Sequence, residues 1–180
     1  MEMIDASLFG RTNTIVETMR YMKSIDAKVM VEIGGCRSMG GQQGDGHSTV
    51  AWGEYQKEYD LEIHTVDIDA AAQACCRELT KSYDMNYHNT DAEAFVKSFD
   101  KKIDFFYLDG VPPEFRFTLI REILAKMADK SLILFDDIEG QPPLFGDELM
   151  LGAFAIPYMM INGYSLIFAK ERQVLLGRGL

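Results

Sequence analysis

The chain has 180 residues, about the size of one domain, and its 18 basic and 28 acidic side chains give a formal net charge of −10. Hydrophobic residues make up 47% and charged residues 26%, a composition that excludes a globally disordered or collagen-like chain. The acidic balance argues against nucleic acid and anionic membranes as partners. No run approaches the roughly 20 apolar residues of a membrane span, and we expect no signal peptide. Three cysteines without metal-site spacing fit a reducing cytoplasm.

Five short apolar runs along the chain predict buried strands. They lie at residues 29–33, 63–67, 85–89, 103–108 and 131–135. A first helix is predicted within residues 1–27, where Thr14-Ile-Val-Glu17 has the pattern of a capping box. The amphipathic runs between the strands predict further helices, which begin near Ser48, Asp69, Asp91 and Glu114. The helix after Asp69 is expected to run from Ala70 to Tyr83. Strands that alternate with helices are typical of an α/β domain with a mostly parallel sheet.

The end of the chain departs from this alternation. Residues 164–169 and 173–176 are two strand-like runs with no room for a helix between them, so they predict an antiparallel hairpin. The predicted fold is therefore α/β and Rossmann-like: a doubly wound, mostly parallel seven-stranded sheet that ends in an antiparallel C-terminal hairpin. We expect residues 1–180 to form a single domain, with an N-terminal helical segment (1–27) and the Rossmann-like core (28–180).

Acidic residues or glycines follow every predicted parallel strand. In a doubly wound sheet, ligands bind outside the carboxyl ends of the strands, so these residues are the main functional signal. They are Glu32, Gly34 and Gly35 at the first strand, Asp67 at the second, Asp91 after the third, Asp109 after the fourth, and Asp136 with Asp137 after the fifth.

The glycine-rich loop after the first strand lacks both the dinucleotide fingerprint and the phosphate-binding loop motif. We therefore expect a nucleoside-like ligand without a diphosphate. Asp67 is placed to accept hydrogen bonds from ribose hydroxyls, or else it is a solvated loop acid. Asp69 is better interpreted as a helix N-cap, and Asp91 either caps its helix or also borders a nucleobase.

The motifs VEIGG, VDID, TDAEAF, DFFYLDG and LILFDDI, taken in this order with the glycine-rich loop, resemble those of class I S-adenosylmethionine-dependent methyltransferases. The resemblance covers residues 28–176. DFFYLDG with LILFDDI is similar to the small-molecule O-methyltransferases of the macrocin and catechol or caffeoyl-coenzyme A type.

The resemblance implies a set of cofactor-binding residues for S-adenosylmethionine. It implies that Glu32 and Gly34 cradle the methionine part, that Asp67 holds the ribose, and that Asp91 and Ala92 lie beside the adenine. The full expected set is Glu32, Gly34, Gly35, Ser38, Asp67, Ile68, Asp91, Ala92 and Asp109.

The resemblance also implies that Asp109, Asp136 and Asp137 match the metal ligands of the metal-dependent branch. Carboxylates that converge at adjacent strand ends repel one another unless a proton or cation relieves them, and oxygen ligands favour Mg²⁺ or Ca²⁺. The alternative is that one of Asp136 and Asp137 points inward while the other caps a loop, because successive strand residues face opposite sides.

The sequence departs from these relatives at the position of their general base. Where catechol-type enzymes carry a lysine there is Pro112, and where macrocin-like relatives carry a histidine there are Val111, Pro112 and Pro113. Asp109 and Asp136 are the remaining catalytic candidates.

The leading hypothesis is an S-adenosylmethionine-dependent methyltransferase that acts on a hydroxyl of a small molecule, with a divalent metal as a candidate helper. One alternative is a catalytically inactive S-adenosylmethionine-binding or regulatory protein. Another is an RNA or protein methyltransferase, against which the acidic charge counts. We expect no nucleic acid or membrane partner, and a homodimer would supply the substrate lid that so short a chain lacks.

Overall fold

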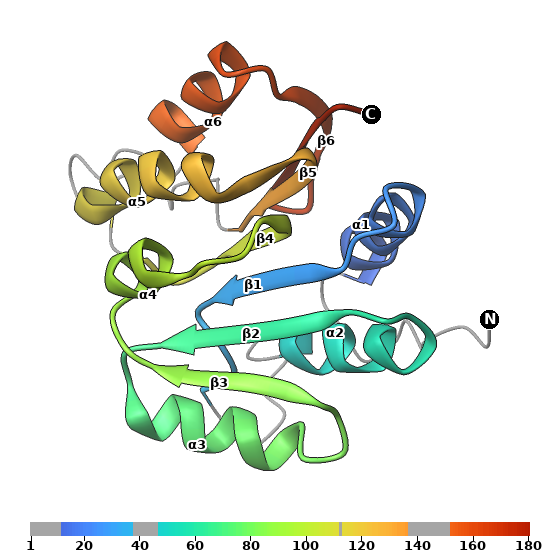
Figure 1. Cartoon of the computed structure of the whole chain (residues 1–180), viewed down its shortest axis with the longest axis vertical. Coiled ribbons are helices and arrows are strands. Elements are labelled where there is room, and N and C mark those ends of the chain that lie inside the picture. Colours follow the sequence, from blue (N-terminus) through green and yellow to red (C-terminus); the bar gives the residue numbers. More distant parts are fainter. Residues whose placement is uncertain (1–11, 38–46, 112, 137–151) are drawn as a thin grey trace.

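The structure is a computed structural model that describes residues 12–37, 47–111, 113–136 and 152–180 (Figure 1). Seven strands form one sheet. They are β1 (Val29–Ile33), β2 (Glu62–Asp67), β3 (Met85–Asn89), β4 (Ile103–Leu108), β5 (Met127–Phe135), β6 (Ser165–Lys170) and β7 (Gln173–Arg178). Their order is β3-β2-β1-β4-β5-β7-β6. Strands β1 to β5 run parallel, and β7 is antiparallel to both β5 and β6. The predicted seven-stranded sheet and its C-terminal hairpin are thus confirmed.

The described residues form six helices, which cover both faces of the sheet. They are α1 (Thr12–Ser24), α2 (His47–Glu58), α3 (Ala70–Leu79), α4 (Ala92–Ser98), α5 (Pro113–Lys126) and α6 (Gly152–Ile161). One hydrophobic core joins α1 and α2 to the sheet through Met19, Trp52 and Phe105. The other core joins α4, α5 and α6 to the opposite face through residues such as Phe95 and Ile120. Figure 1 shows α1 and the α4–α5 pair on opposite sides of the sheet.

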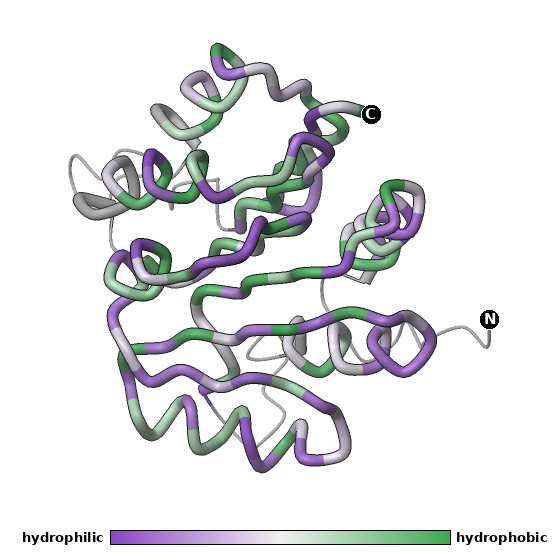
Figure 2. The backbone as a smooth tube through the Cα atoms, in the orientation of Figure 1, coloured by the Kyte–Doolittle hydropathy of each residue, from purple (hydrophilic) through white to green (hydrophobic). Residues whose placement is uncertain are grey.

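The alternation of side chains along each strand decides which core a residue joins. Met30 belongs to the core under α1 and α2, whereas its neighbour Val31 belongs to the core under α4 and α5. Figure 2 shows hydropathy changing repeatedly between purple and green along helices such as α3, as expected for helices with one buried side. The position of a polar residue along its strand therefore determines which face of the sheet, and which core, its side chain faces.

Two local predictions at helix ends are wrong. Thr14 is not an N-cap, because α1 begins at Thr12 and the buried Thr14 hydroxyl instead donates to Glu171 Oε2 at 3.4 Å. The helix that opens after Asp69 ends at Leu79 rather than near Tyr83. There the hydroxyl of Thr80 donates to the Cys76 carbonyl at 2.5 Å and satisfies one of the last carbonyls of α3.

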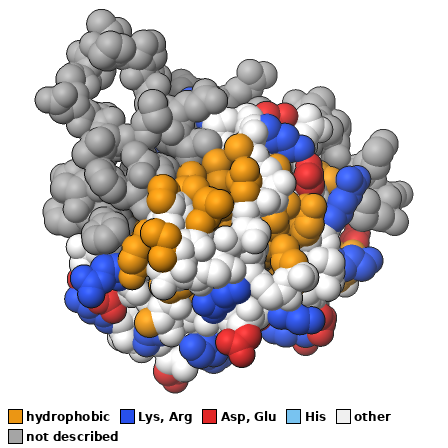
Figure 3. All heavy atoms as spheres, turned by 90° about the horizontal axis from the view of Figure 1, so that it is seen from above, with side chains coloured by type: hydrophobic (Ala, Val, Ile, Leu, Met, Phe, Trp, Pro, Cys, Tyr) orange, Lys and Arg blue, Asp and Glu red, His pale blue; other side chains and the backbone are white. Residues whose placement is uncertain are grey.

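Helix α6 and strand β6 carry exposed hydrophobic side chains at the end of the sheet. Ala155 and Met159 of α6 are buried in the core, so this helix packs on the sheet. Met160, Ile161 and Leu166 are exposed, and Figure 3, which looks onto this end from above, shows a hydrophobic patch there. None of the described helices is long and apolar enough to cross a membrane.

Candidate functional site

The carboxyl ends of four neighbouring strands meet at one edge of the sheet and bring the predicted residues together. Backbone hydrogen bonds fix this edge: Gly34 donates to the Val66 carbonyl at 3.0 Å, and Asp109 donates to the Ile33 carbonyl at 2.9 Å. Asp136 lies next to this pair, since its N–H donates to the Leu108 carbonyl at 3.0 Å. The predicted positions Gly34, Asp109 and Asp136 therefore belong to one continuous edge.

Gly34 and Gly35 fit this edge only because they lack a side chain. Gly34 has φ +83°, and a Cβ built on it would lie 2.5 Å from the Asp109 carbonyl oxygen. A Cβ on Gly35 would lie 2.5 Å from Cys76 Sγ. The chain thus turns closely over β4 and α3 at the start of the glycine-rich loop.

Asp67, at the end of β2, is held by backbone donors on both sides. Its Oδ1 accepts from the Asp69 N–H at 2.8 Å, and its Oδ2 accepts from the Gly35 N–H at 3.3 Å. Each carboxylate oxygen has two lone pairs, so both oxygens keep the capacity to accept from a ligand. Ile68, the next residue, is 73% exposed and presents a large apolar side chain beside this carboxylate.

Asp69 and Asp91 are N-caps, as one interpretation of each residue predicted. Asp69 accepts from the Ala71 N–H at 2.8 Å at the start of α3, and Asp91 accepts from the Ala94 N–H at 2.9 Å at the start of α4. The carbonyl of Asp67 also accepts from the Thr90 N–H at 3.2 Å, which ties the segment before Asp91 to the end of β2.

A buried polar group surrounds Glu32 on the face of the sheet that α2 covers. We call it the Glu32 cluster: Glu32, Ser48, Thr49, Trp52 and Thr65. Ser48 Oγ and Trp52 Nε1 both donate to Glu32 Oε1 at 3.1 Å. Glu32 Oε2 and the hydroxyls of Thr49 and Thr65 are buried, and among the described residues they have no hydrogen-bond partner of regular geometry.

Burial governs the ionisation of Glu32, whose side chain is fully inaccessible. Loss of hydration raises the pKa of this carboxyl to about 7, although the nearby Thr49 and Ser48 hydroxyls oppose the rise. A carboxyl that titrates near neutrality is costly to bury when one of its oxygens has no regular partner among the described residues, unless a ligand or water pairs with it. Glu32 therefore fits a site that receives a hydrogen-bond donor or a positive charge.

Asp136, the first residue after β5, is buried and paired with Tyr107. The Tyr107 hydroxyl donates to Asp136 Oδ2 at 2.5 Å. Burial raises the pKa of Tyr107 well above its usual range, and the negative charge of Asp136 adds to that effect. Tyr107 therefore stays protonated and fixes Asp136 at the edge beside Asp109.

Two predicted site residues, Ser38 and Asp137, lie outside the described residues. Within the part of the chain that the structure describes, no three His, Cys, Asp or Glu side chains form a group that could hold a metal ion. Of the predicted metal ligands, Asp109 and Asp136 are the two whose backbones the structure brings together.

Comparison with known families identifies the fold. A family model described as a methyltransferase domain matches residues 42–138, which is more than half of the chain. The chain belongs to this methyltransferase family. The expected resemblance to class I S-adenosylmethionine-dependent methyltransferases is thereby confirmed. No curated protein sequence matches the chain.

Solved structures share the fold of this methyltransferase domain at low sequence identity. The N-methyltransferase NodS from Bradyrhizobium japonicum WM9 has a TM-score of 0.65 and 13% identity, with 94% of this chain and 96% of that chain covered. The O-methyltransferase from Bacillus cereus, solved in complex with S-adenosylhomocysteine, has a TM-score of 0.63 and 9% identity, with 92% and 80% covered. Magnesium protoporphyrin IX methyltransferase from Synechocystis PCC 6803, with the same molecule bound, has a TM-score of 0.60 and 12% identity, with 94% and 84% covered.

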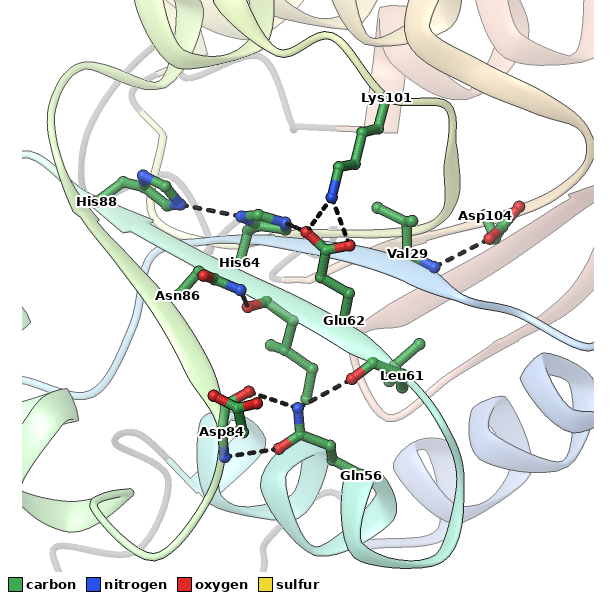
Figure 4. A network of polar contacts seen from close by, with 11 residues as sticks. Val29, Gln56, Leu61, Glu62, His64, Asp84, Asn86, His88, Lys101 and Asp104 are labelled. Carbon is green, nitrogen blue, oxygen red and sulfur yellow. Dashed lines mark hydrogen bonds and ion pairs between the residues drawn. The ribbon is translucent and has the colours of Figure 1, made fainter.

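A second polar cluster lies on the opposite face of the methyltransferase sheet (Figure 4). We call it the histidine chain: Lys101, Glu62, His64 and His88. Lys101 Nζ donates to Glu62 Oε1 at 2.6 Å and to Oε2 at 2.7 Å. His64 Nε2 lies 2.8 Å from Glu62 Oε1, and His64 Nδ1 lies 3.0 Å from His88 Nε2.

The partners of the histidine chain assign its protons. A carboxylate only accepts, so neutral His64 carries its proton on Nε2 and its Nδ1 accepts from His88 Nε2–H. Burial lowers the pKa of both imidazoles, and the positive charge of Lys101 adds to the lowering at His64. Both ring nitrogens of His64 and both oxygens of Glu62 are thus paired, and His64 is a buried residue on this face of the sheet.

A cavity of about 510 Å³ opens between the end of β3 and α4. Its lining residues are His88, Thr90, Ala94, Phe95, Ser98, Phe99 and Asp100. Thr90 and Ala94 flank Asp91 and Ala92, so the cavity borders the segment that the family resemblance places beside the adenine.

The residues that hold the two buried acids, Glu32 and Asp136, were not predicted from the sequence. Trp52 was not predicted as a donor to Glu32, and Tyr107 was not predicted as a partner of Asp136. Strand pairing contains the missing signal, because Glu32 lies opposite Thr65 on β2 and opposite Tyr107 on β4. Residues opposite one another on parallel strands share a face, so Thr65 and Tyr107 lie on the same side of the sheet as Glu32.

Proposed function

We propose that this methyltransferase transfers a methyl group from S-adenosylmethionine to a hydroxyl of a small molecule. The observation that carries the proposal is the buried Oε2 of Glu32, which has no hydrogen-bond partner of regular geometry among the described residues and lies beside the glycines that turn over β4. Solved relatives of the same fold were crystallised with S-adenosylhomocysteine, the product of this cofactor. One of them is an O-methyltransferase, which supports oxygen as the acceptor atom.

The residues at the strand ends suit the cofactor in chemistry and in shape. Glu32 would accept from the cofactor's amino group, and Gly34 and Gly35 would let the backbone approach its methionine part. Asp67 would accept from the ribose hydroxyls, with Ile68 against the nucleoside. Asp91 and Ala92 would flank the adenine, and Asp109 and Ser38 would complete the set. When bound, the cofactor supplies an electrophilic methyl group.

The two acids after β4 and β5 would handle the proton of the substrate hydroxyl. Asp136 is buried and held by Tyr107, so its position is defined, and Asp109 lies on the neighbouring strand end. One of these carboxylates would take the hydroxyl proton as general base. Alternatively, Asp109, Asp136 and Asp137 would hold Mg²⁺ or Ca²⁺, which lowers the pKa of a bound hydroxyl.

Calorimetry with S-adenosylmethionine tests the cofactor half of the proposal. The chain should bind it, and the absence of binding would sink the proposal. Production of S-adenosylhomocysteine with a panel of small phenols and alcohols tests catalysis. Cofactor binding without turnover on any acceptor would favour the catalytically inactive or regulatory alternative, while turnover only on RNA or protein would favour that class of substrate.

A chelator distinguishes the two proposed roles of Asp109 and Asp136, which are metal binding and general-base catalysis. If a metal assists, chelation should abolish methyl transfer, and added Mg²⁺ should restore it. Asp109→Asn should then remove the metal response while cofactor affinity falls by less than it does in Asp67→Ala. If activity survives chelation, the metal hypothesis is overturned and Asp109 or Asp136 is left as the general base.

We further propose that residues 1–180 act as one domain and that two copies associate as a homodimer. A partner copy would then supply a substrate lid. Light scattering on the purified protein measures the mass in solution, and a monomer would contradict the dimer.

A further inference from the structure

Three thiols converge where the glycine-rich loop leaves β1 and passes over α3. Cys36 follows Gly35 in the loop, and Cys75 and Cys76 are consecutive in α3. Cys36 Sγ lies 3.5 Å from Cys75 Sγ. The Cys36 N–H donates to Cys76 Sγ at 2.8 Å, so Cys76 fixes the backbone position of Cys36. The sequence analysis interpreted these cysteines only as a sign of a reducing compartment.

The two consecutive cysteines of α3 have different surroundings. Cys76 is fully buried against the loop, and burial raises the pKa of its thiol to about 12, so it stays protonated and unreactive. Cys75 is partly exposed, and its sulfur is the one that faces Cys36. Consecutive residues of a helix do not face each other, which excludes a bond between Cys75 and Cys76. Cys75 is therefore the accessible thiol, and Cys36 is its neighbour.

We propose that Cys36 and Cys75 form a reversible disulfide under oxidation by a hydroperoxide, and that this bond fastens the glycine-rich loop to α3. A disulfide sulfur pair lies about 2.05 Å apart, so the two sulfurs must approach by roughly 1.5 Å. The loop side of that movement is carried by Cys36, whose neighbour Gly35 donates to Asp67.

The chemistry balances with hydrogen peroxide as the oxidant. The Cys75 thiolate attacks one peroxide oxygen, the O–O bond breaks, and a sulfenic acid forms with release of one water. The Cys36 sulfur then attacks the Cys75 sulfur, and the hydroxyl leaves with a proton as the second water. The two thiols lose two electrons in total, and the peroxide gains them. A dithiol reverses the bond by exchange.

The effect of the bond on cofactor binding rests on the proposed function. Closing the disulfide pulls the loop toward α3 and strains the Gly35–Asp67 hydrogen bond, which is already 3.3 Å long. Because this bond holds the Asp67 carboxylate that would accept from the ribose, we expect its loss to cost the cofactor about one hydrogen bond, which corresponds to about fivefold in affinity. We therefore expect the oxidised protein to bind S-adenosylmethionine about fivefold more weakly than the reduced protein.

Mass spectrometry of the peroxide-treated full chain tests the disulfide without reference to activity. The wild-type protein should lose two hydrogens per chain and regain them with dithiothreitol, and fragment spectra should link Cys36 to Cys75. Cys75→Ser should abolish the intramolecular bond, whereas Cys76→Ala should keep it. If Cys76→Ala does not fold, the fragment spectra of the wild type alone decide between Cys75 and Cys76.

A bond to Cys76, or oxidation that ends at sulfinic acid or in cross-linked dimers, would overturn the proposal. Calorimetry on oxidised wild type and oxidised Cys75→Ser then tests the coupling, because only the wild type should lose affinity. Equal affinities for the oxidised and reduced wild type would overturn the coupling. If the reduced protein binds no S-adenosylmethionine but forms the bond, the proposed function fails and the disulfide stands.

Discussion

Two polar clusters, each built around a glutamate, lie on opposite faces of the same sheet, and they differ in how completely they are paired. In the histidine chain, Glu62 has partners on both oxygens and His64 on both nitrogens (Figure 4). In the Glu32 cluster, one carboxylate oxygen and two threonine hydroxyls have no regular partner among the described residues. Buried polar groups are normally paired, so the cluster that is not paired is the one that fits a ligand.

The two clusters also respond to charge in opposite ways. Burial raises the pKa of Glu32, whereas the Lys101 ammonium holds the pKa of Glu62 below its usual range. The histidine chain therefore stabilises its carboxylate, and the Glu32 cluster destabilises the carboxylate that it contains. We expect the histidine chain to stabilise the fold, and the Glu32 cluster to lower stability while it binds a ligand.

Glu32→Gln should give the largest change in stability. The pKa of Glu32 is about 7 in the folded protein and about 4.5 in the unfolded one. The stability that the protonated Glu32 side chain contributes is therefore fully present below pH 4.5 and is lost as pH rises through 7. Ionisation then costs about 3 kcal/mol at pH 8. Glutamine keeps the acceptor for Ser48 and Trp52 and removes this cost. Urea unfolding at pH 8 should show the variant to be more stable than the wild type, while its affinity for S-adenosylmethionine falls.

Glu62→Gln is the matched control on the opposite face. The pKa of Glu62 is lowered, so its carboxylate stabilises the folded state, and the glutamine variant should be less stable at pH 8 with unchanged cofactor affinity. A loss of stability in Glu32→Gln at pH 8 would contradict the contrast between the two clusters.

Asp67→Ala should give the next largest effect, on affinity instead of stability. Hydrogen bonds to a charged group contribute about 1.5–3 kcal/mol each, so losing the proposed ribose acceptor should weaken S-adenosylmethionine binding at least tenfold. His64→Gln, in the histidine chain, is the comparison variant. Titration calorimetry measures the S-adenosylmethionine affinity of both variants, and urea unfolding measures their stability. The first variant should lose affinity and the second should lose stability; unchanged affinity in Asp67→Ala would remove this residue from the site.

The backbone at the carboxyl ends of the parallel strands was predictable from the sequence, because local patterns determine where each strand ends. Continuous apolar runs identified the parallel strands, and acids or glycines at their ends identified Gly34, Asp67, Asp109 and Asp136 as neighbours. The partners of the buried acids were not predictable in the same way. Trp52 reaches Glu32 from α2, and Tyr107 reaches Asp136 from a neighbouring strand, so both contacts depend on strand order and helix packing.

The histidine chain was missed for a related reason. Glu62 and His64 alternate along β2, which reveals only that they share a face, while His88 reaches them from β3 and Lys101 from the loop that follows α4. The thiol pair depends in the same way on α3 packing over the loop. These are contacts between distant segments, which no local pattern contains.

Acidification should destabilise the protein through the histidine chain. The pKa of His64 and of His88 is lowered in the folded state, so the unfolded chain binds more protons once pH falls below the ordinary imidazole value of 6.5. Their contribution to stability is therefore present above pH 6.5 and is lost on going below it, opposite in sign to that of Glu32. Thermal unfolding of wild type and His88→Gln between pH 5 and 7 should show a shallower loss in the variant, and identical slopes would contradict this origin.

Lys101→Met should give the smallest effect and the finest test of the comparison. The Lys101–Glu62 ion pair is half exposed, with 50% of the lysine side chain accessible, so its loss should cost less than about 1 kcal/mol in urea unfolding.

The same change removes a positive charge that lowers the pKa of His64, while the bond from His64 to Glu62 stays. NMR titration of the imidazole should therefore show the pKa of His64 rising in the variant. Lys57→Met, which breaks an exposed lysine–glutamate pair on α2, should leave that pKa unchanged. A falling pKa of His64 in Lys101→Met would mean that Lys101 acts mainly by holding Glu62 in place, because losing the carboxylate from His64 would outweigh losing the lysine charge.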